Sequence, residues 1–444
     1  MGVVKNEQTS GTLGRGIKMG RLGFSLVGSY LGYQAQNLLY GESKLAERQS
    51  SFHRNISRKV REELGALKGP AMKLGQVLSM QTEALPEEAL QELAHLQMQA
   101  PGMHASLVRA QFKSALGRYP EDVFRRFEPE PFAAASLGQV HRAITQSGEK
   151  VAVKIQYPAI RSAIESDFKL LRSATLPTRI TGHIPTALVD EIQRGLLEET
   201  DYLREADNLD FFRQGLAHLP YVTIPRVHRE LTADRVLTMS FIEGETFSNL
   251  QQRKLSQALR DQVGARLVET FETQLRLLKR LHADYHPGNF LLLPEGGIGM
   301  VDFGCIKHIS FDVTELRRGY RERVWRKSET AARNFLSYLY GPGVPYARAR
   351  RSLPIMERWA DLVYPPNSTA DLAADFGGDS ALMSKLKKIG MEHQRQVLRD
   401  KLINPDLAFV TRADMGLRYF LCELGAKVNL TKIWDKVAAQ MPNR

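Results

Sequence analysis

The stretch HADYHPGNFLLLPEGGIGMVDFG, residues 282–304, decides the fold. It opens with a polar loop that contains Asp284 and, five positions later, Asn289. Two short apolar runs follow, and the turn-forming segment 294–297 between them predicts a β-hairpin. Asp302 lies at the end of the second run, thirteen residues after Asn289. We therefore expect a loop, a hairpin, and a carboxylate at the hairpin's end.

A small β-rich segment precedes this loop. Residues 131–158 contain short strand-forming runs around a Gln-Ser-Gly-Glu turn, in the sequence PFAAASLGQVHRAITQSGEKVAVKIQYP. Lys154 lies on the third predicted strand. A helical pattern covers 188–215. Two further strands are expected at 224–227 and 235–242, on either side of a turn. Five strands and one helix would then form a small lobe.

The rest of the chain is predicted to be helical. Helix-type spacing of apolar residues covers 44–99, and a long amphipathic run covers 259–281. Everything beyond about residue 311 is also predicted helical, apart from a loop at 365–380. The chain is therefore expected to be an α+β protein in which a β-rich lobe is followed by a helical lobe.

This order of elements resembles that of protein kinases. There a lysine on a strand meets the α- and β-phosphates of the nucleotide and is oriented by a helix carboxylate. The resemblance gives that role to Lys154 and makes Asp284 the base or the water-orienting group. Asn289 and Asp302 would hold Mg²⁺ through their side-chain oxygens. The implied cofactors are ATP and Mg²⁺, bound by a bilobal, protein-kinase-like fold.

Over about residues 40–310 the chain resembles one branch of this fold, the UbiB/AarF/ADCK atypical kinase-like family. Where kinases have a Gly-rich loop, this chain reads AAASLGQVH, which is similar to the family's alanine-rich loop. Alanine resists the positive φ angles that glycine permits, so this loop should be stiffer. Upstream, KLGQ is similar to the family's KxGQ motif on an N-terminal helical extension. No Ala-Pro-Glu follows DFG, which argues against a peptide-positioning activation segment.

The segment GLLEETDYLREADN resembles the family's ExD stretch. On one continuous helix, Glu199 and Asp201 would be about 200° apart, whereas Asp201 and Glu205 would differ by only about 40°. The three carboxylates could not then serve one cation. We therefore assign Glu205 to Lys154, and Glu199 with Asp201 to Lys73 or to metal, which would require the helix to bend or the side chains to reach around it. A solvated acidic face is the alternative for each carboxylate.

The resemblance implies a set of site residues and a division of the chain. The catalytic residues would be Asp284 and Lys154, and the metal ligands Asn289 and Asp302. The nucleotide-binding residues would be Ala133, Ala134, Ala135, Ser136, Gly138, Lys154, Met239 and Phe241. The ion-pair or regulatory residues would be Lys73, Gln76, Glu199, Asp201 and Glu205. The expected domains are a basic N-terminal arm at 1–40, the KxGQ extension at 41–128, the kinase-like N-lobe at 129–243 and the helical C-lobe at 244–444.

The composition, 43% hydrophobic and 25% charged, is that of a globular protein and disfavours a disordered chain or a multi-span membrane protein. Two cysteines are too few for a disulfide framework, and neither a secretory signal nor a spanning run of about 18 apolar residues is evident. We therefore expect a cytoplasmic location, with peripheral attachment to the inner face of a membrane. The oligomeric state is left open.

Charge points to an anionic partner. The net charge is +12, and residues 1–70 hold eleven Lys or Arg and five Asp or Glu, which is half of that excess. A basic, weakly apolar helix in the N-terminal arm could lie on an anionic membrane, where each nearby Lys or Arg contributes about 1 kcal/mol. A loosely ordered arm is the alternative. Basic residues are not interleaved with stacking aromatics, so nucleic acid is not an expected partner.

These expectations combine into a leading hypothesis, an atypical kinase or ATPase of the UbiB type. The resemblance implies a role in ubiquinone-type, isoprenoid-quinone lipid biosynthesis, with quinone-pathway lipids or proteins as partners. One alternative is a nucleotide-gated module that binds or presents lipids with little catalysis. A protein kinase acting on other proteins is a further alternative, and a small-molecule kinase of the aminoglycoside type is more distant.

Overall fold

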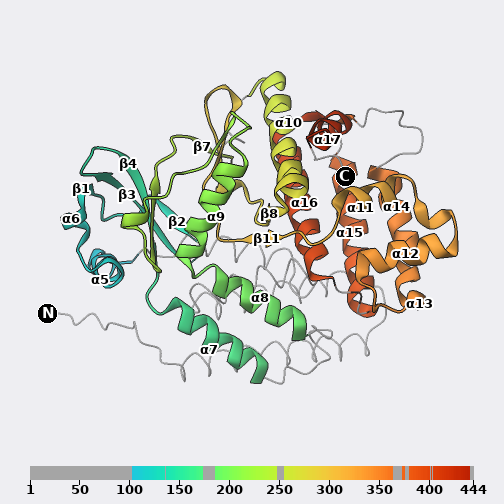
Figure 1. Cartoon of the computed structure of the whole chain (residues 1–444), viewed down its shortest axis with the longest axis horizontal. Coiled ribbons are helices and arrows are strands. Elements are labelled where there is room, and N and C mark those ends of the chain that lie inside the picture. The colour runs from blue at the N-terminus through green and yellow to red at the C-terminus, as the bar shows by residue number, and fades with distance from the viewer. Residues whose placement is uncertain are drawn as a thin grey trace, which may run out of the picture. The chain divides into compact units, whose positions relative to one another are not determined.

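The computed structural model describes residues 103–135, 137–173, 186–247, 255–363, 373–375, 380–400, 402 and 404–440 (Figure 1). These residues form two compact units. The first unit contains the described residues up to Asp201 together with Ala233–Leu237. The second unit contains Tyr202–Thr232 and the described residues from Thr238 onward. The predicted α+β composition is confirmed.

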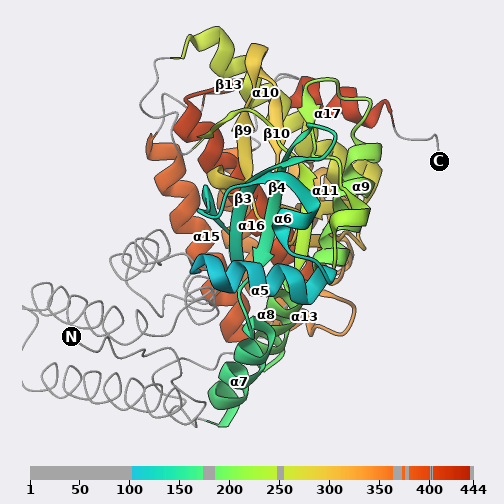
Figure 2. The ribbon, with the colours of Figure 1, turned by 90° about the vertical axis from the view of Figure 1, so that its left-hand side faces the viewer.

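The first unit is built on a five-stranded sheet. Its strands are β1 (Phe124–Phe127), β2 (Ala133–Ala135), β3 (Gly138–Thr145), β4 (Lys150–Gln156) and the start of β6 (Val236–Ser240). The order is β1-β3-β4-β6, and β2 pairs with β3. The predicted hairpin between β3 and β4 is present, and its turn contains Gly148 at φ 88°, an angle that favours glycine. The helix α5 (Ala105–Leu116) packs against β4, and α6 (Pro120–Val123) leads into β1 (Figure 2).

Three helices occupy the segment between β4 and the next strand, where one was predicted. They are α7 (Ile160–Ser173), α8 (Thr186–Glu198) and α9 (Tyr202–Gly215). The predicted continuous helix over 188–215 is wrong, because it breaks at 199–201. Thr200 explains the break: its Oγ1 donates to the carbonyl of Leu197 at 2.6 Å, and its own carbonyl accepts from Gln156 Nε2 at 2.9 Å. These bonds replace the helical pattern at this point.

A second sheet lies in the second unit. It is composed of β5 (Val222–Thr223), β7 (Glu245–Thr246), β9 (Phe290–Leu292) and β10 (Ile298–Met300), in the order β5-β10-β9-β7. The predicted hairpin of β9 and β10 is confirmed, and η6 (Pro294–Gly296) forms its turn. Of the predicted strand at 224–227, only an isolated antiparallel bridge between Val227 and Met239 is present. The regular strand lies earlier, at β5, and it pairs in parallel with β10, a partner that is distant in sequence.

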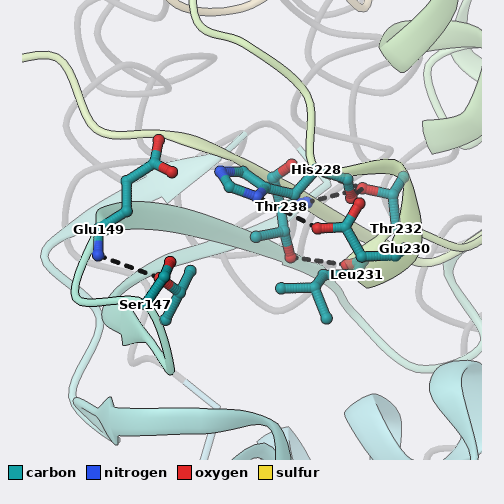
Figure 3. A network of polar contacts seen from close by, with 8 residues as sticks. Ser147, Glu149, His228, Glu230, Leu231, Thr232 and Thr238 are labelled. Carbon is teal, nitrogen blue, oxygen red and sulfur yellow. Dashed lines mark hydrogen bonds and ion pairs between the residues drawn. The ribbon is translucent and has the colours of Figure 1, made fainter.

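The turn after β5 is held by two threonines (Figure 3). It contains the short helix η2 (Arg229–Leu231), and the backbone N–H of Thr238 donates to Thr232 Oγ1 at 3.1 Å. The hydroxyl of Thr238, which is fully buried, donates to the carbonyl of Leu231 at 2.7 Å. Leu231, Thr232 and Thr238 all belong to the second unit, so these bonds hold together the two ends of the segment 233–237.

The remainder of the second unit is mainly helical. In chain order its elements are α10 (Gln257–Thr273), the π-helix η4 (Gln274–Leu278), β8 (Arg280–His282), η5 (Pro287–Asn289), β11 (Ile306–His308), α11 (Val313–Arg321), η7 (Val324–Arg326), α12 (Glu329–Tyr340), α13 (Tyr346–Ala349), η8 (Arg350–Ser352), α14 (Leu353–Val363), β12 (Ala373–Asp375), α15 (Ser380–Asp400), α16 (Pro405–Leu424), β13 (Lys427–Asn429) and α17 (Leu430–Ala438). The helices after residue 311 were predicted. The antiparallel pair of β12 and β13 was not, and β12 lies where a loop was expected.

An apolar cluster joins the helices of this region. Trp325, Phe335 and Leu339 are buried in it together with Met356 and Leu402.

Among the described residues, no helix combines the length and the apolar character needed to cross a bilayer.

The pair Tyr340 and His393 ties α12 to α15 and predicts a pH dependence. The Tyr340 hydroxyl and His393 Nε2 are 2.6 Å apart, and burial lowers the pKa of His393 to about 4. Between about pH 6.5 and 4, histidine in the unfolded chain, with a pKa near 6.5, is protonated, whereas His393 in the folded protein stays neutral. The stability of the fold should therefore decrease as the pH falls from about 6.5 to 4, by at most about 3 kcal/mol.

The substitution His393→Gln should flatten this part of the pH profile, because glutamine keeps a hydrogen-bonding group for Tyr340 but does not titrate. The measurement is the urea midpoint of both proteins between pH 7.5 and 4.5. Parallel profiles for the two proteins would show that His393 is not the titrating group.

Candidate functional site

The loop that contains Asp284 is closed at its base by a strand pair. β8 pairs antiparallel with β11, so residues 283–305 leave and return at one place. The backbone N–H of Ala283 donates to the carbonyl of Cys305 at 2.9 Å, which extends the closure by one more bond. Residues 283–305 therefore form one segment whose two ends are joined, and this segment contains the Asp-x-x-x-x-Asn loop, the hairpin and DFG.

His282 connects the start of this segment to its end. Its Nε2 donates a very short hydrogen bond to the carbonyl of Asp302. The imidazole is fully buried, and this burial lowers the pKa of His282. The ring is therefore neutral at neutral pH, with its proton on the nitrogen that faces a carbonyl acceptor. This bond holds the backbone of Asp302 beside the residue that precedes Ala283 and Asp284.

Asn289 is joined to Asp284 and to the strand before Asp302. Its Nδ2 donates to Asp284 Oδ2 at 3.0 Å and to the carbonyl of Asp284 at 3.1 Å. The carbonyl of Asn289 accepts from the N–H of Val301 at 3.1 Å. The structure therefore brings together Asp284, Asn289 and Asp302, which were predicted because their order and spacing resemble those of protein kinases. Because the amide nitrogen is used for Asp284, Oδ1 is the atom of Asn289 suited to a cation.

The donor atoms suit a hard cation bound with a nucleotide. A partly exposed carboxylate from Asp302 and the amide oxygen of Asn289 are oxygen ligands, and Mg²⁺ takes one or two such ligands together with phosphate oxygens. Asp302 Oδ1 also accepts from the N–H of Gly304 at 3.0 Å, which orients the carboxyl group. Within the part of the chain that the structure describes, no group of three or more His, Cys, Asp or Glu side chains suited to a metal ion occurs.

The helix α9 contacts the backbone of DFG, a role that the sequence did not indicate. Glu205 is 2% exposed, and its Oε1 accepts from the N–H of Phe303 at 3.3 Å. Asn208, one helical turn later, donates from Nδ2 to the carbonyl of Phe303 at 3.0 Å. The ring of Phe212 lies 5.1 Å from that of Phe303. Because these side chains recur on one face of α9, the helix fixes the residue after Asp302.

The expected nucleotide-binding residues of the first unit lie on neighbouring strands. Lys154 is on β4, opposite Val140 of β3, and the residue is 6% exposed. The three alanines of the alanine-rich loop form β2, and Ala135 is opposite Gly138 at the start of β3. The predicted loop is therefore partly strand. The expected stiffness of the alanine run stays a prediction.

A buried polar network next to β2 was not predicted from the sequence. Gln139, opposite Ala134, accepts from the N–H of Met103 through Oε1 at 2.7 Å, and its Nε2 is 2.8 Å from Nε2 of His141. His141 Nδ1 is 2.9 Å from the carbonyl of Glu128, and burial lowers the pKa of His141. The neutral ring can donate from Nδ1 and accept at Nε2, which satisfies both contacts.

The acidic residues divide between the two units. Glu199 and Asp201 lie in the turn between α8 and α9, in the first unit, and Glu205 lies in the second. The angles calculated for a continuous helix therefore do not apply to them. The assignment of Glu205 to Lys154 stays a prediction, as does the adenine contact of Met239 and Phe241. Lys73, Gln76 and Ser136 lie outside the described residues.

Comparisons with known proteins agree on a family. Residues 95–329, slightly more than half of the chain, match the model of the ABC1 atypical kinase-like domain. The Arabidopsis thaliana Protein ACTIVITY OF BC1 COMPLEX KINASE 7, chloroplastic, is 31% identical over 283 residues, which are 61% of this chain and 41% of that protein. The AarF domain-containing protein kinase 1 of Mus musculus is 30% identical over 276 residues, 62% of this chain and 53% of that protein. The chain therefore spans about half the length of these relatives.

Solved structures support the same fold. A structure of Rv3197 from Mycobacterium tuberculosis, described as a complex with erythromycin, has a TM-score of 0.58 and 27% sequence identity to this chain. The match covers 88% of this chain and 98% of that one. The extent of the family match, its location over β1–β11 and the agreement in fold lead to one conclusion: the chain belongs to the ABC1 atypical kinase-like family, the family that is also named UbiB, AarF or ADCK.

Proposed function

We propose that the chain is an Mg-ATP-dependent atypical kinase or ATPase that supports ubiquinone-type, isoprenoid-quinone lipid biosynthesis. The observation that carries the first part is the arrangement of Asp284, Asn289 and Asp302 around one closed loop, with His282 linking its two ends. The second part is carried by membership of the family and by the charge of the N-terminal arm.

Each residue has a role in this proposal. Asp284, held by Asn289, orients the attacking hydroxyl or water and accepts its proton. Asn289 Oδ1 and the Asp302 carboxylate would hold Mg²⁺, which when bound would neutralise charge on the phosphates. Lys154 contacts the α- and β-phosphates from β4. The basic arm at 1–40 places the protein on an anionic membrane surface.

The test is phosphate release from ATP by the purified full chain, with Mg²⁺ or with EDTA. Each condition is repeated with neutral vesicles, with anionic vesicles, and with anionic vesicles that contain a polyprenylated phenol. We expect turnover that requires Mg²⁺ and rises in the presence of anionic lipid, with a further rise when the phenol is added.

Other outcomes point elsewhere. Nucleotide binding without turnover in every condition would contradict catalysis and favour a nucleotide-gated lipid-binding module. Turnover that is equal with neutral and anionic vesicles would remove the membrane part of the proposal. A response to anionic lipid but not to the phenol would remove the quinone part.

A further inference from the structure

A π-helix lies directly before the loop that contains Asp284. The helix α10 ends at Thr273, and Gln274–Leu278 continues it as a π-helix that leads into β8. Such turns are rare inside α-helices and often occur at functional sites, since they change the direction of the side chains that follow. The first residue of this turn, Gln274, is fully buried.

The amide of Gln274 spans the catalytic loop. Its Oε1 accepts from the backbone N–H of His282 at 2.9 Å, and its Nε2 lies 3.2 Å from the hydroxyl of Tyr285, to which it donates. His282 and Tyr285 stand on the two sides of Asp284 in the sequence. One side chain from η4 therefore restrains the loop both before and after the expected catalytic carboxylate.

Tyr285 is itself enclosed, so its position is transmitted to the backbone. Its ring lies 5.2 Å from that of Phe271 and 4.9 Å from that of Phe290. On another side, Gly416 of α16 approaches so closely that an added Cβ would lie 2.9 Å from the carbonyl oxygen of Tyr285. Because Tyr285 is held at its hydroxyl, at its ring and at its backbone carbonyl, the backbone of the neighbouring Asp284 has little conformational freedom.

We propose that Gln274 is a positioning residue, which sets the orientation of Asp284 through His282 and Tyr285. The inference rests on the proposed function, because it assigns the support of that same catalytic loop. Glutamine suits the role because it offers an acceptor and a donor on one rigid amide group. The π-helix places this group against the loop. Small displacements of a catalytic group have large effects, about 100-fold for 1 Å.

The experiment compares single-site variants for kcat, for the KM of ATP and for hydrogen exchange of the loop. Gln274→Met, which lacks both polar atoms, should lower kcat on the order of 10- to 100-fold with a KM within about twofold. Tyr285→Phe, a milder change, should lower kcat by about threefold to tenfold. Gln274→Glu should recover part of the loss, since its oxygens can accept from His282 N–H and from a rotated Tyr285 hydroxyl.

A matched control lies one turn earlier on α10. Thr270 is 1% exposed, and its Oγ1 donates to the carbonyl of Arg266 at 2.8 Å, so Thr270→Val removes a buried polar group whose bond does not reach the loop. This variant should keep kcat within about twofold of the wild type. If Gln274→Met and Thr270→Val lower stability and kcat in parallel, Gln274 is merely structural and the proposal is overturned.

Hydrogen exchange separates this inference from the proposed function. In Gln274→Met the backbone amides of residues 282–289 should exchange at least about tenfold faster, whereas those of β9 and β10 should not change. If the wild type shows no turnover, the proposed function fails, and the exchange of residues 282–289 still decides whether Gln274 orders the loop. Unchanged exchange in Gln274→Met and Tyr285→Phe would overturn the positioning role, whatever the activity.

Discussion

Asp302→Asn should lower Mg-ATP turnover on the order of 10³-fold while leaving the fold intact. The loss corresponds to about 4 kcal/mol of transition-state stabilisation, in the range expected for removing an electrostatic group at transferring phosphates. Asparagine keeps an oxygen that can accept from the N–H of Gly304, as Asp302 Oδ1 does at 3.0 Å. The bond from His282 goes to the backbone carbonyl and is also kept. The variant therefore removes charge with little change in geometry.

Asp312→Asn is the control for this variant. Asp312 caps α11, and its Oδ1 accepts from the N–H of Thr314 at 2.9 Å, an arrangement like that of Asp302 and Gly304. Asparagine is also a good N-cap residue, so stability and turnover should both stay near the wild type. The measurement is phosphate release under saturating Mg-ATP, with melting temperatures for both variants. Turnover of Asp302→Asn within tenfold of the wild type would rule out the metal role of Asp302.

Glu272→Gln should produce the largest loss of stability among conservative changes in the second unit. Glu272 is 2% exposed and forms a 3.0 Å ion pair with Arg276, which is 6% exposed. Arg317 approaches the same carboxylate more closely. Removing the negative charge takes this carboxylate away from two guanidinium groups, of which Arg276 is 6% exposed and Arg317 is 18% exposed, and breaking a buried ion pair costs about 3–5 kcal/mol. At the lower estimate of about 3 kcal/mol, the melting temperature of a unit of this size should decrease by roughly 6–12 °C.

The comparison for this variant is Glu329→Gln. Glu329 pairs with Arg333 at 2.9 Å on the surface of α12, where both side chains are more than half exposed. Its loss should cost less than about 1 kcal/mol, since water screens the pair. Thermal unfolding followed by circular dichroism distinguishes the two cases. Equal shifts would mean that the buried cluster contributes no more than a surface ion pair.

The parts of the site that the sequence predicted are those written in short local patterns. Asp284, Asn289 and Asp302 lie in one closed segment because only a simple hairpin separates Asn289 from Asp302. Lys154 follows from a β-run after a turn, a signal contained within a few residues. Local patterning of this kind is read directly from the order of residues.

The parts that were missed depend on partners far away in the sequence. Glu205 reaches Phe303 across 98 positions, and β5 pairs with β10 although about 75 residues separate them. Periodicity carries no information about such partners. The helix break at Thr200 depends on a bond from Gln156, 44 positions earlier, and the helical pattern on both sides concealed it. Gln274 likewise looked like an ordinary polar residue of a long helix.

The C-terminal helices supply contacts to the Asp284 loop that become available only late in synthesis. Gly416 packs against Tyr285, Phe420 lies 5.5 Å from Phe290, and Arg276 donates to the carbonyl of Trp434 across 158 positions. At about 5–20 residues per second, roughly 8–30 s pass between synthesis of the loop and synthesis of Trp434. During this interval the nascent loop lacks these contacts, so the ribosome-bound chain contains the sequence of the Asp284 loop before it contains the surfaces that hold that loop in place.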